Sequence, residues 1–323
     1  MNSAVTCSLL KRSVLNIYSR LQPVTYQTSS YSTTGGGHHA HGRSPQLPPK
    51  LTIDGVKHIV AVSSAKGGVG KSTMAVNLAL ALSSLDKMNL SVGILDADVF
   101  GPSLPIMMNL NNMKPSVDEQ TTRMIPLQNY GVKCMSMGFL VEPEDAIVWR
   151  GPMVMSGLER LLRQTQWGSL DVLIVDLPPG TGDAILTMCQ RVPLSGAVIV
   201  STPQDVALAD VIRGVKMFKQ VDVPILGVVE NMSYFECTNC NHKTHIFGNG
   251  GAKKTAESLG IKVLGEVPLS IEIRELSDSG KPITVQSPDS VQAQNYKSIA
   301  RNLLEQLYHQ SKKKTTPTIT FDD

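Results

Sequence analysis

A glycine-rich loop with two lysines is the stretch of this 323-residue sequence best suited to chemistry. It reads A-K-G-G-V-G-K-S-T over residues 65–73, after a mostly apolar run at 58–62 and before a helical pattern at 74–82. Glycines let backbone N–H groups approach phosphate oxygens, and the N-terminus of the following helix adds a partial positive charge. A strand, a glycine-rich turn, Lys-Ser and a helix, in this order, predict a nucleotide-phosphate site.

Two side chains of this loop have specific expected roles. Lys71 is expected to reach the β- and γ-phosphates, and Ser72 to ligate Mg²⁺. The other expected phosphate-site residues are Lys66, Gly67, Gly68, Val69, Gly70 and Thr73. Ala65 stands where the pattern usually has its first glycine, and an alanine can occupy that position when φ is negative. Nucleotide binding is therefore expected, and the hydrolysis rate is left open. A glycine turn without a ligand is the alternative, and Lys-Ser in register after a strand favours the phosphate site.

Acidic residues follow two other apolar runs. Asp176 follows the run at 172–175, which is the arrangement that places a carboxylate near Mg²⁺, directly or through water. Asp96 and Asp98 follow the run at 90–95. Two carboxylates beside a metal–phosphate site are compatible only when the cation is present, because otherwise they repel. The alternative for the 96–98 pair is capping of the turn at Ser103.

A C-x-x-C motif, Cys237 and Cys240, lies in a polar stretch with His242 and His245 close behind. Four interpretations are open: an iron–sulfur cluster shared by two subunits, zinc bound by these four residues, a redox dithiol, or no ligand. Zinc sites usually have a longer loop between ligand pairs, and redox C-x-x-C motifs usually begin a helix after a strand. A cluster shared between two chains would have the four thiolates that one C-x-x-C lacks.

Strand and helix patterns alternate through the rest of the chain, which predicts an α/β fold with a mostly parallel sheet covered on both faces. Ligands of such sheets bind at the carboxyl ends of the strands, where the acidic motifs lie. The expected strands are 58–62, 90–95, 172–175, 196–200, 224–229 and 262–267, with a hairpin within 121–136. The expected helices are 74–82, 153–162, 184–190, 206–218, 252–259 and 291–307.

The N-terminal segment, residues 1–50, differs in composition from the rest. It is rich in Ser and Thr, has no acidic residue and ends in Gly/His- and Pro-rich stretches. This composition predicts a mitochondrial transit peptide with a linker, and hence a mitochondrial matrix protein; a plain disordered tail is the alternative. Residues 51–310 are expected to form the folded domain and 311–323 a disordered tail.

Charge and hydropathy limit the possible partners. Five of the 30 Lys and Arg residues lie in the first 50 positions, which leaves 25 basic against 27 acidic residues for the remainder. Such a slightly acidic domain is not expected to bind nucleic acid. No apolar run approaches the length of a membrane span, so membrane association is expected to be peripheral at most.

The pattern K-G-G-V-G-K-[ST] resembles the deviant Walker A motif of the MinD, ParA, ArsA and nitrogenase iron-protein superfamily. That resemblance implies that Lys66 crosses a dimer interface to the partner's nucleotide. It also implies that Asp98 orients the attacking water and that Asp96 supports Mg²⁺ through water. Asn231 matches the superfamily's adenine-reading residue, with a turn-forming asparagine as the alternative. The segment after Asp176, L-P-P-G-T-G-D, resembles the nucleotide-sensing switch II loop.

Several motifs occur together in one order: L-D-A-D-V-F-G-P-S, V-W-R-G-P-M, V-D-L-P-P-G-T-G-D, V-S-T-P-Q-D, E-N-M-S and C-T-N-C. Over residues 57–295 the chain resembles the Mrp/ApbC branch of these P-loop ATPases, of the SIMIBI type. The resemblance implies an ATP- and Mg²⁺-binding homodimer, a slow ATPase, that bridges a [4Fe–4S] cluster through Cys237 and Cys240 of both subunits. It further implies cluster delivery to complex I subunits. The alternative is a MinD/ParA-like ATPase switch with a structural zinc at the C-x-x-C.

Overall fold

The computed structural model describes residues 53–85, 88–140, 151–240 and 242–315. The chain divides into two compact units, Met1–Gln46 and Leu47–Asp323, and every described residue belongs to the second. The predicted transit peptide and linker, and the V-W-R part of the V-W-R-G-P-M motif, lie outside the described residues.

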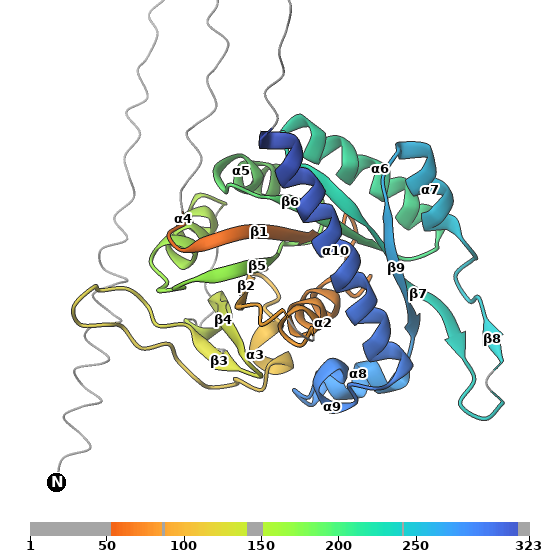
Figure 1. The fold of residues 1–323 in the computed structure, drawn as a ribbon, viewed down its shortest axis with the longest axis horizontal. Coiled ribbons are helices and arrows are strands. Elements are labelled where there is room, and N and C mark those ends of the chain that lie inside the picture. The colour runs from red at the N-terminus through yellow and green to blue at the C-terminus, as the bar shows by residue number, and fades with distance from the viewer. Residues whose placement is uncertain (1–52, 86–87, 141–150, 241, 316–323) are drawn as a thin grey trace, which may run out of the picture. The chain divides into compact units, whose positions relative to one another are not determined.

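A nine-stranded sheet forms the centre of the described part of the chain (Figure 1). The strand order is β3-β4-β2-β5-β1-β6-β7-β8, with β9 paired to β7, and only the β3–β4 and β7–β8 pairs are antiparallel. The strands are β1 (Val56–Ser63), β2 (Val92–Asp96), β3 (Leu127–Asn129), β4 (Val132–Ser136), β5 (Leu170–Asp176), β6 (Gly196–Ser201), β7 (Ile225–Glu236), β8 (Lys243–Thr244) and β9 (Val263–Leu269). The predicted mostly parallel α/β fold is confirmed.

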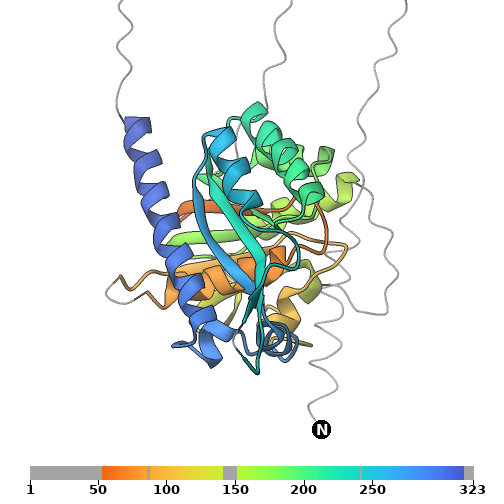
Figure 2. The ribbon, with the colours of Figure 1, turned by 90° about the vertical axis from the view of Figure 1, so that its right-hand side faces the viewer.

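Helices cover both faces of this sheet (Figures 1 and 2). They are α2 (Lys71–Ser83), α3 (Leu104–Met107), α4 (Gly151–Arg163), α5 (Asp183–Arg191), α6 (Asp205–Gln220), α7 (Gly251–Leu259), α8 (Ile271–Asp278), α9 (Ile283–Gln286) and α10 (Val291–Thr315). Helices α2 and α10 pack together on one face, and α4, α5 and α6 lie on the other. Strands buried on both faces require this double cover, and α2 is correspondingly buried on almost every side from Met74 to Leu82.

The register of the central strands determines where the site forms. β2 and β5 run parallel, and Asp96 lies directly opposite Asp176 at their carboxyl ends. β1, the other neighbour of β5, pairs Val62 with Asp176 before it leads into the glycine-rich loop. The loop and the predicted carboxylates therefore meet at one edge of the sheet.

Two elements differ in extent from the sequence-based prediction, and the expected hairpin is confirmed. Strand β7 runs to Glu236 rather than ending at 229, because β9 pairs with its middle and β8 with its end. Helix α10 runs to Thr315, into the stretch assigned to the tail, and residues 316–323 lie outside the described part. The predicted hairpin is β3–β4, which turns at Tyr130 and Gly131.

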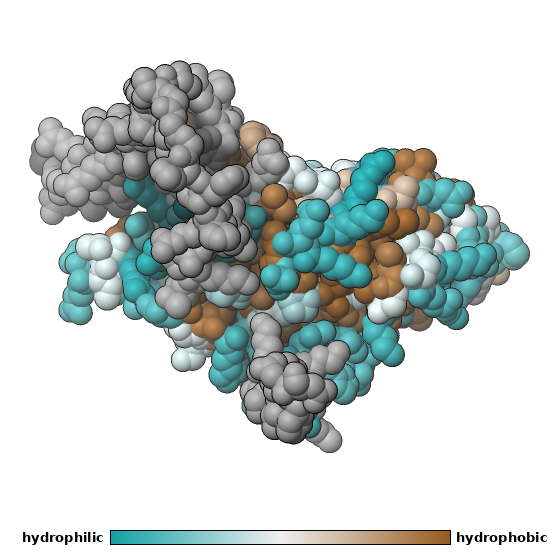
Figure 3. All heavy atoms as spheres, turned by 90° about the horizontal axis from the view of Figure 1, so that it is seen from above, coloured by the Kyte–Doolittle hydropathy of each residue, from teal (hydrophilic) through white to brown (hydrophobic). Residues whose placement is uncertain are grey.

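The surface carries apolar residues interspersed with hydrophilic ones. Figure 3 shows apolar residues gathered near the middle of one face, between hydrophilic ones. In the described ranges, no helix has the combined length and apolar character needed to cross a bilayer.

Candidate nucleotide and cysteine sites

The glycine-rich loop has the backbone shape of a phosphate cradle. Gly68 and Gly70 both have φ of 79°, a left-handed conformation that favours glycine, and Gly70 is the N-cap of α2. A Cβ built at Gly67 or Gly68 would meet no atom within 4 Å, so space lies open beside the loop. The backbone can therefore approach a ligand at the N-terminus of a buried helix.

Lys71 is the charge at the centre of this site. Its ammonium lies 2.6 Å from Asp176 Oδ1 and 3.9 Å from Asp98 Oδ2, and it donates to Ser72 Oγ at 3.2 Å. The lysine side chain is only 6% exposed. The structure thus brings four of the predicted site residues together at the start of α2.

Asp96 is held in place by backbone and hydroxyl donors. Its Oδ2 accepts from the N–H groups of Ser103 and Leu104 and from Ser136 Oγ, and its Oδ1 accepts from the N–H of Asp98. The bond from the Ser103 N–H agrees with the capping role, whereas the sequence does not indicate Ser136, which pairing of β4 with β2 brings opposite Asp96. Asp96 therefore both shapes the 96–104 turn and faces the site.

The carboxylates of this cluster destabilise one another's charged forms. Burial, followed by the charge of Asp176, raises the pKa of Asp96 to about 7. Burial also raises the pKa of Asp176, and the neighbouring Lys71 ammonium opposes this increase. Extra positive charge supplied by a cation would therefore be favourable here.

The donor set fits Mg²⁺ bound together with a nucleotide. No group of three or more His, Cys, Asp or Glu side chains in the described ranges converges into a ready-made metal site. Mg²⁺ in nucleotide sites usually keeps several waters and takes one or two protein oxygens plus phosphate oxygens. Ser72 Oγ and the Asp176 carboxylate both contact the Lys71 ammonium, which is expected to bind the phosphates. These two groups would therefore be the protein oxygens beside a phosphate-bound Mg²⁺.

Two further loop contacts involve predicted residues. Lys66 is exposed, and Ser64 Oγ holds its carbonyl at 2.9 Å. In the loop after Asp176, Gly180 has φ of 105° and donates its N–H to the Ser64 carbonyl at 2.8 Å. The predicted nucleotide-sensing loop is thus joined directly to the phosphate-binding loop.

Asn231 lies within β7 rather than in a turn after a strand. Its side chain is buried, and Nδ2 donates to the Val69 carbonyl at 2.8 Å. The amide nitrogen is therefore engaged with the phosphate-binding loop, a contact that the sequence did not indicate. Its predicted role in adenine reading stays a prediction.

The C-x-x-C motif forms the turn of the β7–β8 hairpin. The N–H of Cys237 donates to the His242 carbonyl at 3.0 Å, which closes the turn. Hydrogen bonds from the N–H groups of Asn239 and Cys240 lower the pKa of Cys237. Both thiols are free; Cys240 is exposed and Cys237 half-buried. This arrangement favours a thiolate ready to bind a metal or cluster.

The four-ligand zinc site is not assembled in the described residues. His245 Nδ1 lies 3.1 Å from the Ser233 carbonyl, and its ring packs edge-on against Tyr234. Within the part of the chain that the structure describes, the hairpin therefore presents two thiols and no converging histidine.

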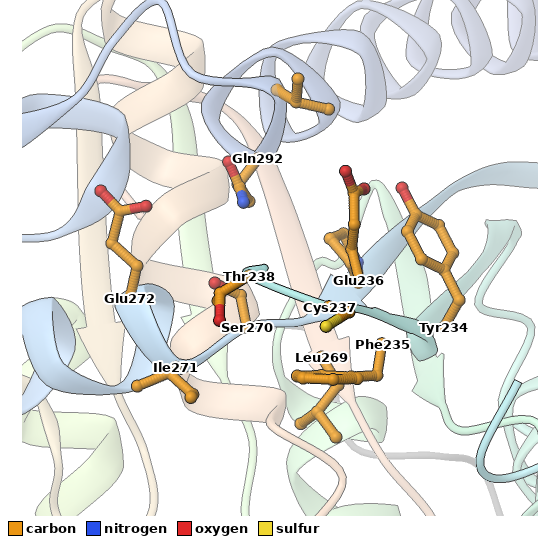
Figure 4. A pocket seen from close by; sticks show the side chains of 12 residues that line it. Tyr234, Phe235, Glu236, Cys237, Thr238, Leu269, Ser270, Ile271, Glu272 and Gln292 are labelled. Carbon is orange, nitrogen blue, oxygen red and sulfur yellow. The ribbon is translucent and has the colours of Figure 1, made fainter. Parts of the chain in front are cut away.

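A pocket of about 240 Å³ adjoins Cys237 (Figure 4). Phe235 lines it from β7 and Thr238 from the turn that follows. The other walls come from the end of β9, the start of α8 and the start of α10, at Leu269, Ile271 and Gln292. The cysteine hairpin thus borders a hollow whose other walls come from distant parts of the sequence.

The parallel sheet, the glycine-rich loop leading into Lys71 and Ser72 of α2, and Asp176 at the end of β5 define a P-loop NTPase. The chain belongs to the ParA family: residues 55–304 match the family model described as NUBPL iron-transfer P-loop NTPase. This confirms the family resemblance found in the motifs.

Similar proteins agree with this assignment. The chain is 68% identical to the iron–sulfur cluster transfer protein NUBPL of Dictyostelium discoideum, over 84% of this chain and 82% of that protein. It is 57% identical to an Arabidopsis thaliana protein described as a mitochondrial iron–sulfur protein required for NADH dehydrogenase, over 80% and 81% of the two chains. Among solved structures, an ADP-bound nucleotide-binding protein from Archaeoglobus fulgidus has a TM-score of 0.64 and 38% identity, covering 75% of this chain and 91% of that one.

Proposed function

We propose that this protein is an ATP-dependent carrier that delivers [4Fe–4S] clusters to complex I subunits in the mitochondrial matrix. The observation that carries the proposal is the pair of free thiols, with the Cys237 pKa lowered by backbone N–H groups, on a chain that also holds a phosphate-binding loop. The cluster-transfer names of the relatives support it.

In the nucleotide half, Lys71 exchanges partners. Its ammonium would turn from Asp176 to the β- and γ-phosphates, and Asp176 and Ser72 would hold Mg²⁺, which would supply charge neutralisation at the phosphates. Asp98, whose carboxylate also lies 3.9 Å from the Lys71 ammonium, orients the attacking water. Lys66 is exposed and reaches the nucleotide of a second copy.

In the cluster half, two copies of the chain are needed. A [4Fe–4S] cluster takes four thiolates, and each C-x-x-C has two. A homodimer in which the P-loop faces meet and the two cysteine hairpins meet brings Lys66 to the partner's nucleotide. The same dimer gives the cluster its four thiolates. The ATPase is slow. It serves cluster transfer, because the nucleotide state governs whether the cluster is retained or released.

The client and the location rest on the relatives and on the N-terminal composition. The Arabidopsis relative is described as required for NADH dehydrogenase and as mitochondrial, which supports complex I subunits as clients. The basic, acid-free segment 1–50 supports import through a transit peptide.

Anaerobic reconstitution with iron and sulfide tests the function. We expect wild-type protein to bind about four irons per dimer, with a visible charge-transfer band. Cys237→Ala and Cys240→Ala should each lose both signals, because a half-site with one thiolate cannot complete the ligand set. Iron content and absorbance measure the outcome.

The matched control is Cys189→Ala, because Cys189 is buried in the core away from the hairpin. This variant should keep the cluster. Zinc retained tightly by wild-type protein in place of iron, and lost in Cys237→Ala, would contradict the carrier function and favour a structural zinc in an ATPase switch.

A further inference from the structure

We propose that Asn231 is a positioning residue that ties the phosphate-binding loop to β7, the strand that leads to Cys237. The inference rests on the proposed function and adds a physical connection between its two halves. Asn231 is 8% exposed, and its Nδ2 donates to the Val69 carbonyl at 2.8 Å. A buried hydrogen bond between segments this far apart in sequence constrains both of them.

On the loop side, the bond sets the direction of a phosphate-binding N–H group. In a trans peptide the carbonyl of Val69 and the N–H of Gly70 point in opposite directions. Holding the carbonyl against Asn231 therefore directs the Gly70 N–H away from β7. Packing is tight at this point, because a Cβ at Gly70 would lie 2.3 Å from Asn231 Nδ2.

On the strand side, β7 is anchored on both sides of Asn231. The Glu230 carboxylate accepts from the N–H of Ala252 at 2.8 Å, at the start of α7. Ser233 Oγ donates to the Val267 carbonyl at 3.2 Å, in β9. Because Glu230 and Ser233 are held in this way, a displacement of Asn231 must be absorbed within β7.

Between Asn231 and the cysteine hairpin the strand is irregular. Met232 has φ of 55°, a left-handed conformation that costs a non-glycine residue about 1 kcal/mol or more. The β7–β9 register also shifts between Asn231 and Phe235. The strained residue Met232, next to the Asn231–Val69 hydrogen bond, is a position where β7 can change its backbone path. A shift of the phosphate-binding loop on nucleotide binding therefore alters the turn at Cys237.

The test uses Asn231→Leu in the full-length protein, because leucine has a similar size, no donor and no added charge. Two ligands are compared by calorimetry: Mg·ATP and Mg·tripolyphosphate, which has no base. Loss of the Asn231–Val69 hydrogen bond should weaken the binding of both ligands by about fivefold, the equivalent of one neutral hydrogen bond. A residue that only reads adenine would affect Mg·ATP and leave tripolyphosphate unchanged, and that result would overturn the proposal.

The second measurement follows Cys237 by the rate of its alkylation, mapped by mass spectrometry, in cluster-free protein. In wild-type protein the rate should change on adding Mg·ATP, and in Asn231→Leu this response should disappear while the nucleotide-free rate stays the same. A response retained at full size when the variant is saturated with Mg·ATP would overturn the connection through Asn231.

Ser233→Ala is the matched control, because it removes one buried hydrogen bond from the same strand without touching the loop. It should keep tripolyphosphate affinity, and an equal loss in both variants would overturn the proposal by showing general damage to β7. A wild-type protein that binds tripolyphosphate but no cluster would remove the proposed function and leave the tie to Val69 in place. A wild-type protein that binds no tripolyphosphate would overturn the positioning role itself.

Discussion

Gly70→Ala is expected to abolish measurable Mg·ATP binding and to destabilise the fold. The new Cβ would lie 2.3 Å from Asn231 Nδ2, which is buried and tied to the Val69 carbonyl. The residue must also keep φ of 79° at the N-cap of α2, which disfavours any side chain. Together the two effects should lower the free energy of unfolding by about 2–4 kcal/mol and the ATP affinity by about 100-fold or more.

Gly68→Ala separates the steric effect from the conformational one. Gly68 has the same φ of 79°, but a Cβ there meets no atom within 4 Å. It should therefore lose only about 1–2 kcal/mol of unfolding free energy, measured by chemical denaturation without nucleotide. Equal destabilisation of the two variants would contradict the close packing of the loop against Asn231.

The sheet and its main helices were predictable because their apolar segments are long and are separated by clear glycine, proline and polar breaks. Buried strands such as β1 and β5 are near-continuous apolar runs, and α2 follows the glycines that begin it. The short helices α3, α8 and α9 were not predicted. With only four to eight residues, each forms through packing rather than through a periodic pattern of its own.

The site was predictable where chemistry is local in sequence and not where it depends on tertiary contacts. Lys71, Ser72 and Asp176 stand in motifs, and the structure gathers them as predicted. The bonds from Asn231 to Val69 and from Ser136 to Asp96 join residues far apart in the chain. No spacing rule indicates them, because they depend on which strands become neighbours in the sheet.

The extension of β7 was missed for a related reason. Polar residues interrupt the apolar pattern over 230–236, yet Glu230 and Ser233 are buried because each finds a backbone partner in a neighbouring element. Buried polar groups that are hydrogen-bonded cost little, so a polar sequence can continue a strand when partners exist. The C-x-x-C therefore follows directly on a strand, in the turn between β7 and β8.

Lys71→Met should weaken nucleotide binding strongly and change how stability depends on pH. Methionine keeps the buried stem and removes the cation between Asp176 and Asp98. Loss of charge-assisted bonds to the phosphates should lower ATP affinity by about 100-fold. Without Lys71, Asp176 becomes a buried carboxylate with no cation, a change that costs about 3–5 kcal/mol when the carboxylate stays ionised.

The sign of the pH effect follows from the raised pKa values. Burial raises the pKa of Asp96 to about 7, above its value in the unfolded chain. The native state then holds protons that the unfolded state releases, so stability falls as pH rises from about 4 toward 7. Lys71 lowers the pKa of both Asp96 and Asp176, so its removal should steepen this fall and extend it to higher pH.

Thermal unfolding of nucleotide-free protein between about pH 5 and pH 8 measures this difference. Lys71→Met should approach wild-type stability at the acid end, where the carboxyls are protonated, and lose most at the alkaline end. The control is Lys57→Met, which breaks the exposed pair with Asp171 and should cost less than about 1 kcal/mol with ATP affinity unchanged. A Lys71→Met variant with the wild-type pH slope would show that the carboxylates do not share one buried environment, and Mg²⁺ would then have no excess negative charge to neutralise at this edge of the sheet.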